Sequence, residues 1–293
     1  MRRLFPFLLV AVLAAPPLGA DPGARFLGAI RLDAAGLEWL GGFSAIEMDA
    51  DGAAAVILSD RGRLFPVQLT RDDGRIAAVA VGAGALLTDA EGLRPPARGA
   101  MDSEGLARLP DGRLALSFEG DMRVAVHGPD GRETWRAAPP AGSGALPGNG
   151  AYEALAADDR GRLYTLAEDP PGDGPVPLYR RATRRWQEIG ALPRSGGFRP
   201  VGLDFDDRGR LYLLERRFSL LGGFAARLTR FEMVDDRLGP GTLMFETTPG
   251  RHGNLEGVSL WRTADGTLVA ALVSDDNFSP LLPSEIVEYA LPD

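Results

Sequence analysis

The chain has 293 residues, a formal net charge of −8, no cysteine and two histidines, and every basic residue is arginine. These counts exclude a disulfide framework, thiol chemistry and Schiff-base lysine chemistry. The acidic balance argues against a nucleic-acid partner, because phosphate backbones are bound by clustered positive charge.

Residues 1–20 have the composition of a secretory signal peptide. Two arginines precede an apolar run from Leu4 to Ala15, and small residues follow before Asp21. The run is short for a bilayer span, and no second run of this kind follows, so we expect no membrane anchor. The sequence therefore predicts an exported protein, periplasmic or secreted, with one domain over residues 21–293.

Five segments of the mature chain share one pattern of residues. They begin at Gly41, Met101, Gly150, Phe198 and Gly253, and each contains two alternating apolar runs joined by an Asp/Gly turn. The turns read DADG, LPDG, DDRG, DDRG and TADG, with glycine where a positive φ is needed. Each segment predicts a β-hairpin.

The hairpins recur every 48 to 60 residues, which leaves room for two more strands in each unit. Units of four antiparallel strands at this spacing are typical of a β-propeller, so the fold class is all-β. We expect six blades, with five as the alternative, because segments 25–40 and 63–98 contain strand-like sequence outside the hairpins. The segment ARFLGAIRLD near the N-terminus is expected to pair with SEIVEYAL near the C-terminus and close the ring.

Acidic residues occupy equivalent positions in several hairpins. Glu104 and Glu153 stand eight residues before the turn glycine, and Glu119 and Glu168 stand seven residues after it. Ser44 and Val201 replace the first carboxylate in two hairpins. Because the start of one strand and the end of its antiparallel partner lie side by side, these residues are expected to meet at one mouth of the central channel.

This arrangement predicts a divalent cation at the channel mouth, most simply Ca²⁺, with Mg²⁺ as the alternative, since oxygen ligands favour these ions. The ligands are expected among Glu104, Glu153, Asn254, Glu256 and Asp275, with Asn149 as a further amide. Glu119 and Glu168 are candidate general bases, and Arg61, Arg199 and Arg216 are candidate substrate-binding residues. The alternative for any single acid is a solvated turn residue.

Two similar pentapeptides, DAEGL from Asp89 and DSEGL from Asp102, differ in their relation to the repeat. DSEGL opens an innermost strand, so Asp102 and Glu104 are expected to point toward the channel mouth. DAEGL is followed by Arg94-Pro95-Pro96, and paired prolines cannot continue a central strand. We therefore expect Asp89 and Glu91 to lie in an exposed connection.

The blocks DSEGLARLPDG, NGAYEALAADDRGRLYTLAE, RPVGLDFDDRGRLYLLERR, NLEGVSLW and LVSDDNFSP resemble the bacterial phytase-like family described as having esterase-like activity. The resemblance spans nearly all of the mature chain and implies a secreted or periplasmic β-propeller. β-Propeller phytases as a class use calcium ions to hydrolyse phosphate monoesters. Calcium-dependent lactonases also place Glu, Asn and Asp around a channel metal, a pattern similar to Glu104, Asn149, Asn254 and Asp275.

These observations together predict a metal-dependent hydrolase of phosphate or carboxylate esters. We expect a small anionic or ester substrate and a monomeric protein. The alternatives are a calcium-dependent lactonase and a non-catalytic propeller that binds a ligand or a protein, because propellers host both kinds of function.

Overall fold

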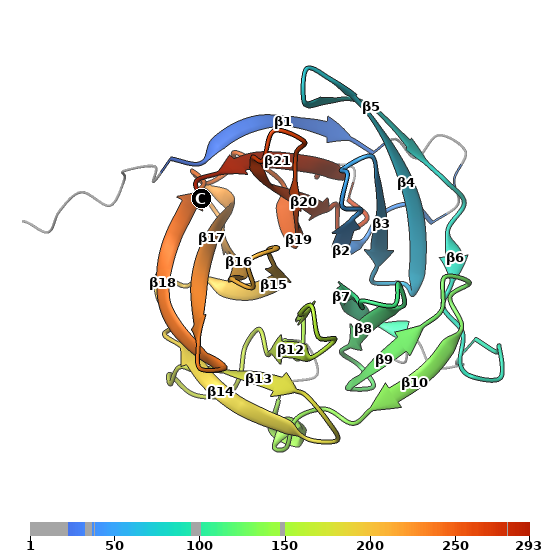
Figure 1. Cartoon of the computed structure of the whole chain (residues 1–293), viewed down its shortest axis with the longest axis vertical. Coiled ribbons are helices and arrows are strands. Elements are labelled where there is room, and N and C mark those ends of the chain that lie inside the picture. Colours follow the sequence, from blue (N-terminus) through green and yellow to red (C-terminus); the bar gives the residue numbers. More distant parts are fainter. Residues whose placement is uncertain (1–22, 33–36, 38, 95–100, 147–149, 280) are drawn as a thin grey trace, which may run out of the picture.

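The computed structural model describes residues 23–32, 37, 39–94, 101–146, 150–279 and 281–293. Within these ranges the strands form five antiparallel sheets around a central axis (Figure 1). Four strands follow one another in each sheet, which is the structure of a propeller blade. The predicted fold class, a β-propeller of four-stranded blades, is therefore confirmed.

The blades follow chain order. Blade one contains β2 (Phe43–Met48), β3 (Ala54–Ser59), β4 (Arg63–Asp72) and β5 (Arg75–Val81), with the short β6 (Ala85–Leu86) paired to β4. Blade two contains β7 (Ser103–Arg108), β8 (Leu114–Phe118), β9 (Arg123–His127) and β10 (Glu133–Ala137). Blade three contains β11 (Ala154–Ala157), β12 (Leu163–Leu166), β13 (Val176–Arg181) and β14 (Trp186–Leu192).

Blade four contains β15 (Arg199–Phe205), β16 (Leu211–Ser219), β17 (Gly223–Val234) and β18 (Arg237–Glu246). Blade five contains β19 (Asn254–Arg262), β20 (Leu268–Asp275), β21 (Glu285–Leu291) and β1 (Arg25–Arg31). A 3-10 helix, η2 (Ser143–Ala145), precedes blade three. No helix in the described ranges is both long and apolar enough to cross a membrane.

The described strands make five blades, so the favoured number of six is corrected to the alternative of five. The sequence set aside for a sixth blade belongs to other blades. Residues 25–31 form β1, which pairs with β21 as the outermost strand of blade five, as the predicted ring closure requires. Residues 63–86 form the outer strands of blade one, β4 and β5, together with β6.

The core lies between the blades. Each cluster of buried apolar side chains joins two neighbouring blades, and β20 illustrates why. Leu268, Ala270 and Leu272 pack toward blade four, whereas Val269 and Val273 pack toward blade one. Because successive residues of a strand face opposite sides, a strand between two blades must be apolar throughout. This explains the continuous run LVAALV at this position.

The predicted hairpin turns are present in all five blades. Gly52, Gly112, Gly161, Gly209 and Gly266 have φ between 68° and 89°. Each glycine N–H donates to the carbonyl three residues earlier, as from Gly52 to Asp49 at 2.9 Å. A side chain is disfavoured at this φ, which is why the turns share glycine. The turns thus fix where each inner strand starts and ends.

The first strands of the blades, β2, β7, β11, β15 and β19, contact one another in a ring around the axis (Figure 1). Four of them carry a register shift near the start, at Phe43/Ala45, Ser103/Leu106, Pro200/Gly202 and Leu255/Gly257. A bulge of this kind turns a side chain out of the regular ladder. The residues displaced include Ser44, Glu104, Val201 and Glu256, and Glu153 stands immediately before β11.

The inner strands pack closely against one another near the axis. The inner strands leave a cavity of about 10 Å³, lined in part by Ser44, Glu153, Val201 and Glu256. That is room for about one water molecule. A Cβ atom on Gly257 would lie 2.7 Å from the Cα atom of Ala45, so glycine is needed for the strands to approach this closely.

Candidate metal centre and active site

A set of carboxylates gathers where the inner strands begin and the second strands end. We call it the acidic crown, and its members are Asp60, Asp102, Glu104, Glu119, Glu153, Glu168, Glu256 and Asp275. They come from blades one, two, three and five. The electrostatic interactions among them link the blades: Glu104 is influenced by Glu256 and Asp60, and Glu153 by Glu168 and Glu104. The structure thus brings together the acids that the repeat aligns.

Blade two supplies the tightest cluster of the acidic crown. Asp102, Glu104 and Glu119 each offer one carboxylate oxygen, and these atoms lie within 4.8 Å of one another. The backbone of Glu119 donates to the Asp102 carbonyl at 2.8 Å, which holds the start of β7 beside the end of β8. Glu119 Oε1 accepts backbone N–H groups from Gly150 and, at 2.9 Å, from Ala151. Its carboxylate is therefore fixed in orientation.

Blade four contributes a cation instead of an acid. Arg216 Nη2 lies 3.3 Å from Glu168 Oε1 and 3.3 Å from Glu256 Oε1. The preceding residue, Glu215, faces away and pairs with Arg227, with Nε to Oε2 at 2.6 Å. Arg216 therefore bridges the carboxylates of blades three and five. It neutralises only part of the charge that the crown gathers.

Blade five adds an amide to the crown. Asn254 and Asp275 are partners across β19 and β20, and the Asn254 amide donates to Glu256 Oε1 at 2.6 Å. The Asn254 side chain is almost fully buried, yet its Oδ1 atom accepts no hydrogen bond from the described residues. A buried acceptor without a donor costs about 1–3 kcal/mol unless a ligand satisfies it.

Blade one contributes Asp60 and Arg61 at the edge of the crown. Ser59 donates to Asp60 Oδ1 at 3.4 Å. The Arg61 guanidinium lies 3.3 Å from the ring centroid of Phe278 and 5.5 Å from that of Trp39. These aromatic contacts hold Arg61 beside the crown, because a guanidinium is attracted to a ring face.

The pKa values of the crown reflect burial without sufficient positive charge. Burial raises the pKa of Glu104 well above its ordinary value, and the Glu256 carboxylate raises it further. Burial raises the pKa of Asp60 to about 7 and that of Asp275 to about 6. Burial also raises the pKa of Glu256 to about 7, although Arg216 opposes this shift. Near neutral pH the crown must therefore hold protons or a cation.

The donor set fits a divalent cation of the Ca²⁺ or Mg²⁺ type. All of the groups offered are carboxylate and amide oxygens, the ligands that these ions prefer. The buried Asn254 Oδ1 is an acceptor without a donor in the described structure, as a cation ligand would be. Asp102, Glu104 and Glu119 are close enough for one ion to contact all three. Their nearest charged neighbours within the crown are other acids.

The predicted residues divide into those at the crown and those outside it. Glu104, Glu153, Glu256, Asn254 and Asp275, the predicted ligands, lie at the crown together with Glu119, Glu168 and Arg216. Arg61 lies at its edge. Arg199 has a half-exposed side chain and pairs with Asp169, Nη2 to Oδ2 at 3.0 Å, and contacts no crown carboxylate that the structure describes. Asn149 is outside the described residues.

Asp102 was not among the predicted ligands, although it completes the tightest cluster. The sequence feature that could have identified Asp102 as a ligand is its spacing of two residues from Glu104, since both residues were expected to point toward the channel mouth. The other pentapeptide is placed as predicted. Asp89 Oδ1 accepts the N–H groups of Glu91 and Leu93 in a turn after β6, and Glu91 is exposed.

Comparison with solved structures finds matches of low sequence identity. A gluconolactonase from Xanthomonas campestris has 15% identity and a TM-score of 0.46, over 86% of this chain and 89% of its own. A glucose dehydrogenase has 12% identity and a TM-score of 0.47, over 93% and 100%. A streptogramin B lyase has 14% identity and a TM-score of 0.43, over 87% and 67%. A search of curated protein sequences finds no match.

A family model described as phytase-like, with the words "esterase-like activity of phytase", matches residues 38–278. The matched range contains the first strand of every blade and all members of the acidic crown. It covers most of the chain, and the arrangement of the blades agrees with the propeller expected from the sequence motifs. The chain belongs to the phytase-like family.

Proposed function

We propose that this protein is a hydrolase of carboxylate or phosphate esters that uses a divalent cation at the acidic crown. The observation that carries the proposal is the cluster of Asp102, Glu104 and Glu119, whose oxygens lie within 4.8 Å of one another on a mouth with little positive charge. Carboxylates so placed repel one another unless a cation or protons offset them. Ca²⁺ is the expected ion, and Mg²⁺ is the alternative.

The chemistry divides between the cation and the side chains. A divalent cation polarises an ester oxygen and makes nearby water more acidic. We assign to Glu168 the role of accepting the proton of the attacking water, since its buried carboxylate lies at the crown, with Arg216 Nη2 at 3.3 Å. The reaction consumes one water, breaks the bond between the acyl or phosphoryl group and the alcohol oxygen, and passes the accepted proton to that oxygen. The products are an acid and an alcohol.

Glu119 and Arg216 have positioning roles in this proposal. Glu119 is held by the backbone N–H groups of Gly150 and Ala151, which fix its orientation as a cation ligand requires. Arg216 sets the place of Glu168 and Glu256. A substrate-binding role for Arg61, Arg199 and Arg216 stays a prediction, as does the general-base role of Glu119.

The proposal is tested on the chain from residue 21 onward, stripped with a chelator and then supplied with Ca²⁺ or Mg²⁺. The substrates are p-nitrophenyl phosphate, p-nitrophenyl butyrate and a γ-lactone. We expect ester hydrolysis that requires the cation and falls by about 100-fold or more in Glu104→Gln, since removal of a charge-stabilising group costs that much. Glu91→Gln is the matched control, because Glu91 occupies the equivalent position of the exposed pentapeptide.

Three other outcomes of this experiment would each change the proposed function. Turnover of the lactone alone would make the protein a lactonase. A protein that binds Ca²⁺ but hydrolyses no substrate on this panel would be a binding propeller, and the hydrolase proposal would fail. Hydrolysis that survives the chelator would exclude the cation from the reaction.

Export is a separate proposal. Residues 1–20 have the pattern of a signal peptide and lie outside the described residues. We propose that the mature protein is periplasmic or secreted and begins near Asp21. N-terminal sequencing of the protein expressed at full length in a Gram-negative host would find this start in the periplasm or medium, whereas an intact Met1 in the cytoplasm would contradict it.

A further inference from the structure

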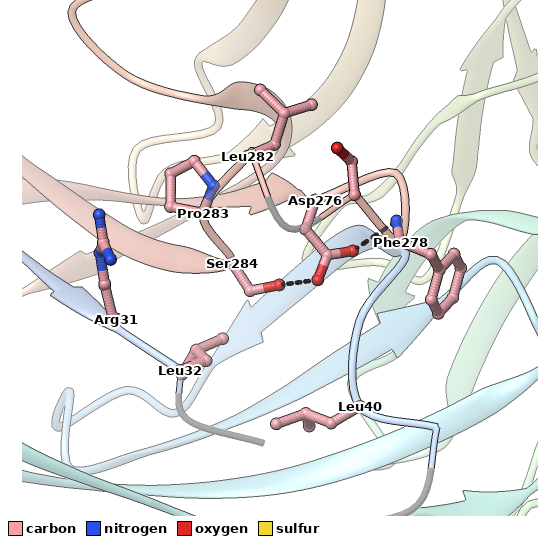
Figure 2. A pocket seen from close by; sticks show the side chains of 9 residues that line it. Arg31, Leu32, Leu40, Asp276, Phe278, Leu282, Pro283 and Ser284 are labelled. Atoms are coloured by element: carbon pink, nitrogen blue, oxygen red, sulfur yellow. Dashed lines mark hydrogen bonds between the residues drawn. The ribbon is translucent and has the colours of Figure 1, made fainter. Parts of the chain in front are cut away.

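A cavity of about 460 Å³ opens beside the acidic crown, between the end of β1 and the loop that follows β20 (Figure 2). Its lining is about half apolar, from Leu32, Leu40, Phe278, Leu282 and Pro283, and half polar. This volume lies within the range of small-molecule sites. The metal centre described above uses none of these side chains.

The cavity and the acidic crown share a wall. Asp276, which lines the cavity, directly follows the crown residue Asp275. A Cβ atom on Gly42 would lie 2.4 Å from Asp60 Oδ1 and 2.5 Å from the Phe278 ring, so Gly42 stands between the crown and the cavity. A ligand in the cavity would therefore lie on the opposite side of Gly42 and Phe278 from Asp60.

The polar groups of the cavity differ in what they can offer a ligand. The carboxylate of Asp276 is already bound: Oδ1 accepts the N–H groups of Gly42 at 3.1 Å and Phe278 at 2.9 Å, and Oδ2 accepts the Ser284 hydroxyl at 2.8 Å. Figure 2 shows two of these bonds on the wall of the cavity. Arg31 lies across the cavity from Phe278 and is exposed. Its backbone pairs with Glu285 in the ladder of β1 and β21, and its guanidinium forms no ion pair or hydrogen bond with any residue that the structure describes.

In this arrangement the positive charge of Arg31 is separated from the acidic crown by the cavity. A carboxylate close to the acidic crown would be repelled, whereas the Arg31 guanidinium offers a positive charge on the far side of the cavity. An apolar chain between the two gains free energy by leaving water, because it is buried against leucine and phenylalanine side chains.

We infer that the cavity binds the apolar body of an anionic carboxylate ester, with the distal negative group at Arg31 and the scissile ester toward the acidic crown. The reaction in this inference rests on the proposed function, whereas the binding does not. The substrate class is an amphiphilic ester whose charge is several carbons from the bond that breaks. Where the charge is a carboxylate on the acyl chain, hydrolysis consumes one water and gives a dicarboxylic acid and an alcohol.

The binding is tested with octanoate and neutral octanamide by isothermal titration calorimetry. Octanoate has the apolar chain and the single charge that the cavity selects, and its binding requires no turnover. We expect Arg31→Gln to weaken octanoate binding by about tenfold while octanamide binding is unchanged, as for loss of a hydrogen bond to a charged group. Arg25→Gln is the control, since Arg25 is exposed on the same strand.

A second variant, Leu282→Trp, fills the cavity at a partly exposed position and should weaken both ligands. Equal octanoate affinity in wild type, Arg31→Gln and Leu282→Trp would overturn the inference, as would the absence of octanoate binding. A protein that binds octanoate in this way but hydrolyses no ester would retain the binding site and refute the proposed function. If the protein hydrolyses esters but Arg31→Gln leaves the KM for a monomethyl dicarboxylate unchanged, the proposed function would stand and the inference about the cavity would be refuted.

Discussion

At the residue scale, the protein concentrates acids at both ends of its inner strands. Besides the acidic crown, Glu47 at the far end of β2 is buried and lies near Asp204 of β15. Arg108 and Asp49 are the other charged neighbours of Glu47, and they pair with each other at 2.9 Å. Burial raises the pKa of Glu47, and the Asp204 carboxylate raises it further. Burial likewise raises the pKa of Asp204 to about 7.

These pKa shifts predict how stability depends on pH. A carboxyl with a raised pKa in the folded state keeps its proton between about pH 4 and pH 7, where the unfolded chain has lost it. The folded state then binds more protons, so the free energy of unfolding falls as pH rises through this window. Glu47→Gln should make that fall smaller. Urea denaturation at several pH values between 4 and 8, with chelator present, measures it. In Glu91→Gln the free energy of unfolding should change with pH as in the wild type. The same pH dependence in Glu47→Gln would contradict the expectation.

The positions of single residues were partly predictable from the sequence. Counting eight residues back from the turn glycine located Glu104 and Glu153 because hairpin turns fix the register of a strand. The count could not show that Glu215 turns outward while Arg216 faces the crown, since that depends on Arg227 of the next strand. The environment of Arg61 was also hidden, because Phe278 and Trp39 are distant from it in sequence.

At the element scale, the inner strands combine bulges with glycine at the points where blades meet. The register shift at Leu255/Gly257 lets Glu256 leave the ladder, and Gly257 lets β19 approach β2. The hairpins were predictable from alternation and turn chemistry. The bulges were not, because they arise from the fit of five strands around one axis.

Gly257→Ala tests the close approach of these strands. The added Cβ would lie 2.7 Å from Ala45 Cα, a backbone atom that cannot move aside without shifting β2. We expect a loss of about 1–3 kcal/mol in the free energy of unfolding, as for overpacked cores. Chemical denaturation measures it. Gly28→Ala in β1 is the control, because nothing lies within 4 Å of its added Cβ, and equal stabilities of the two variants would rule out the steric account.

At the scale of the whole molecule, β1 closes the ring by pairing with β21 (Figure 1). This closure was predictable, since the first and last strand-like segments both lacked a partner in the hairpin pattern. The number of blades was not, because long strands such as β4 and β17 consume sequence that shorter strands would leave for another blade. The length of a strand depends on packing with its neighbours, which composition does not reveal.

Ring closure predicts a large effect of a short truncation. A chain beginning at Leu32 lacks β1, so the edge of β21 is exposed. A chain beginning at Gly23 keeps β1 beside β21. Loss of the buried Leu27 side chain alone costs about 1.5–3 kcal/mol. We expect the Tm to fall by about 5 °C or more. Scanning calorimetry of the two chains measures it, and identical transitions would show that β1 does not hold the ring closed.

We propose that the acidic crown is a divalent cation site built by the propeller repeat. Isothermal titration of Ca²⁺ into chelator-treated protein tests this proposal, with Glu104→Gln and Glu91→Gln titrated alongside. We expect binding by wild type and by Glu91→Gln, and affinity weaker by at least about tenfold in Glu104→Gln. Absence of binding for both Ca²⁺ and Mg²⁺, or equal affinity in all three proteins, would contradict it.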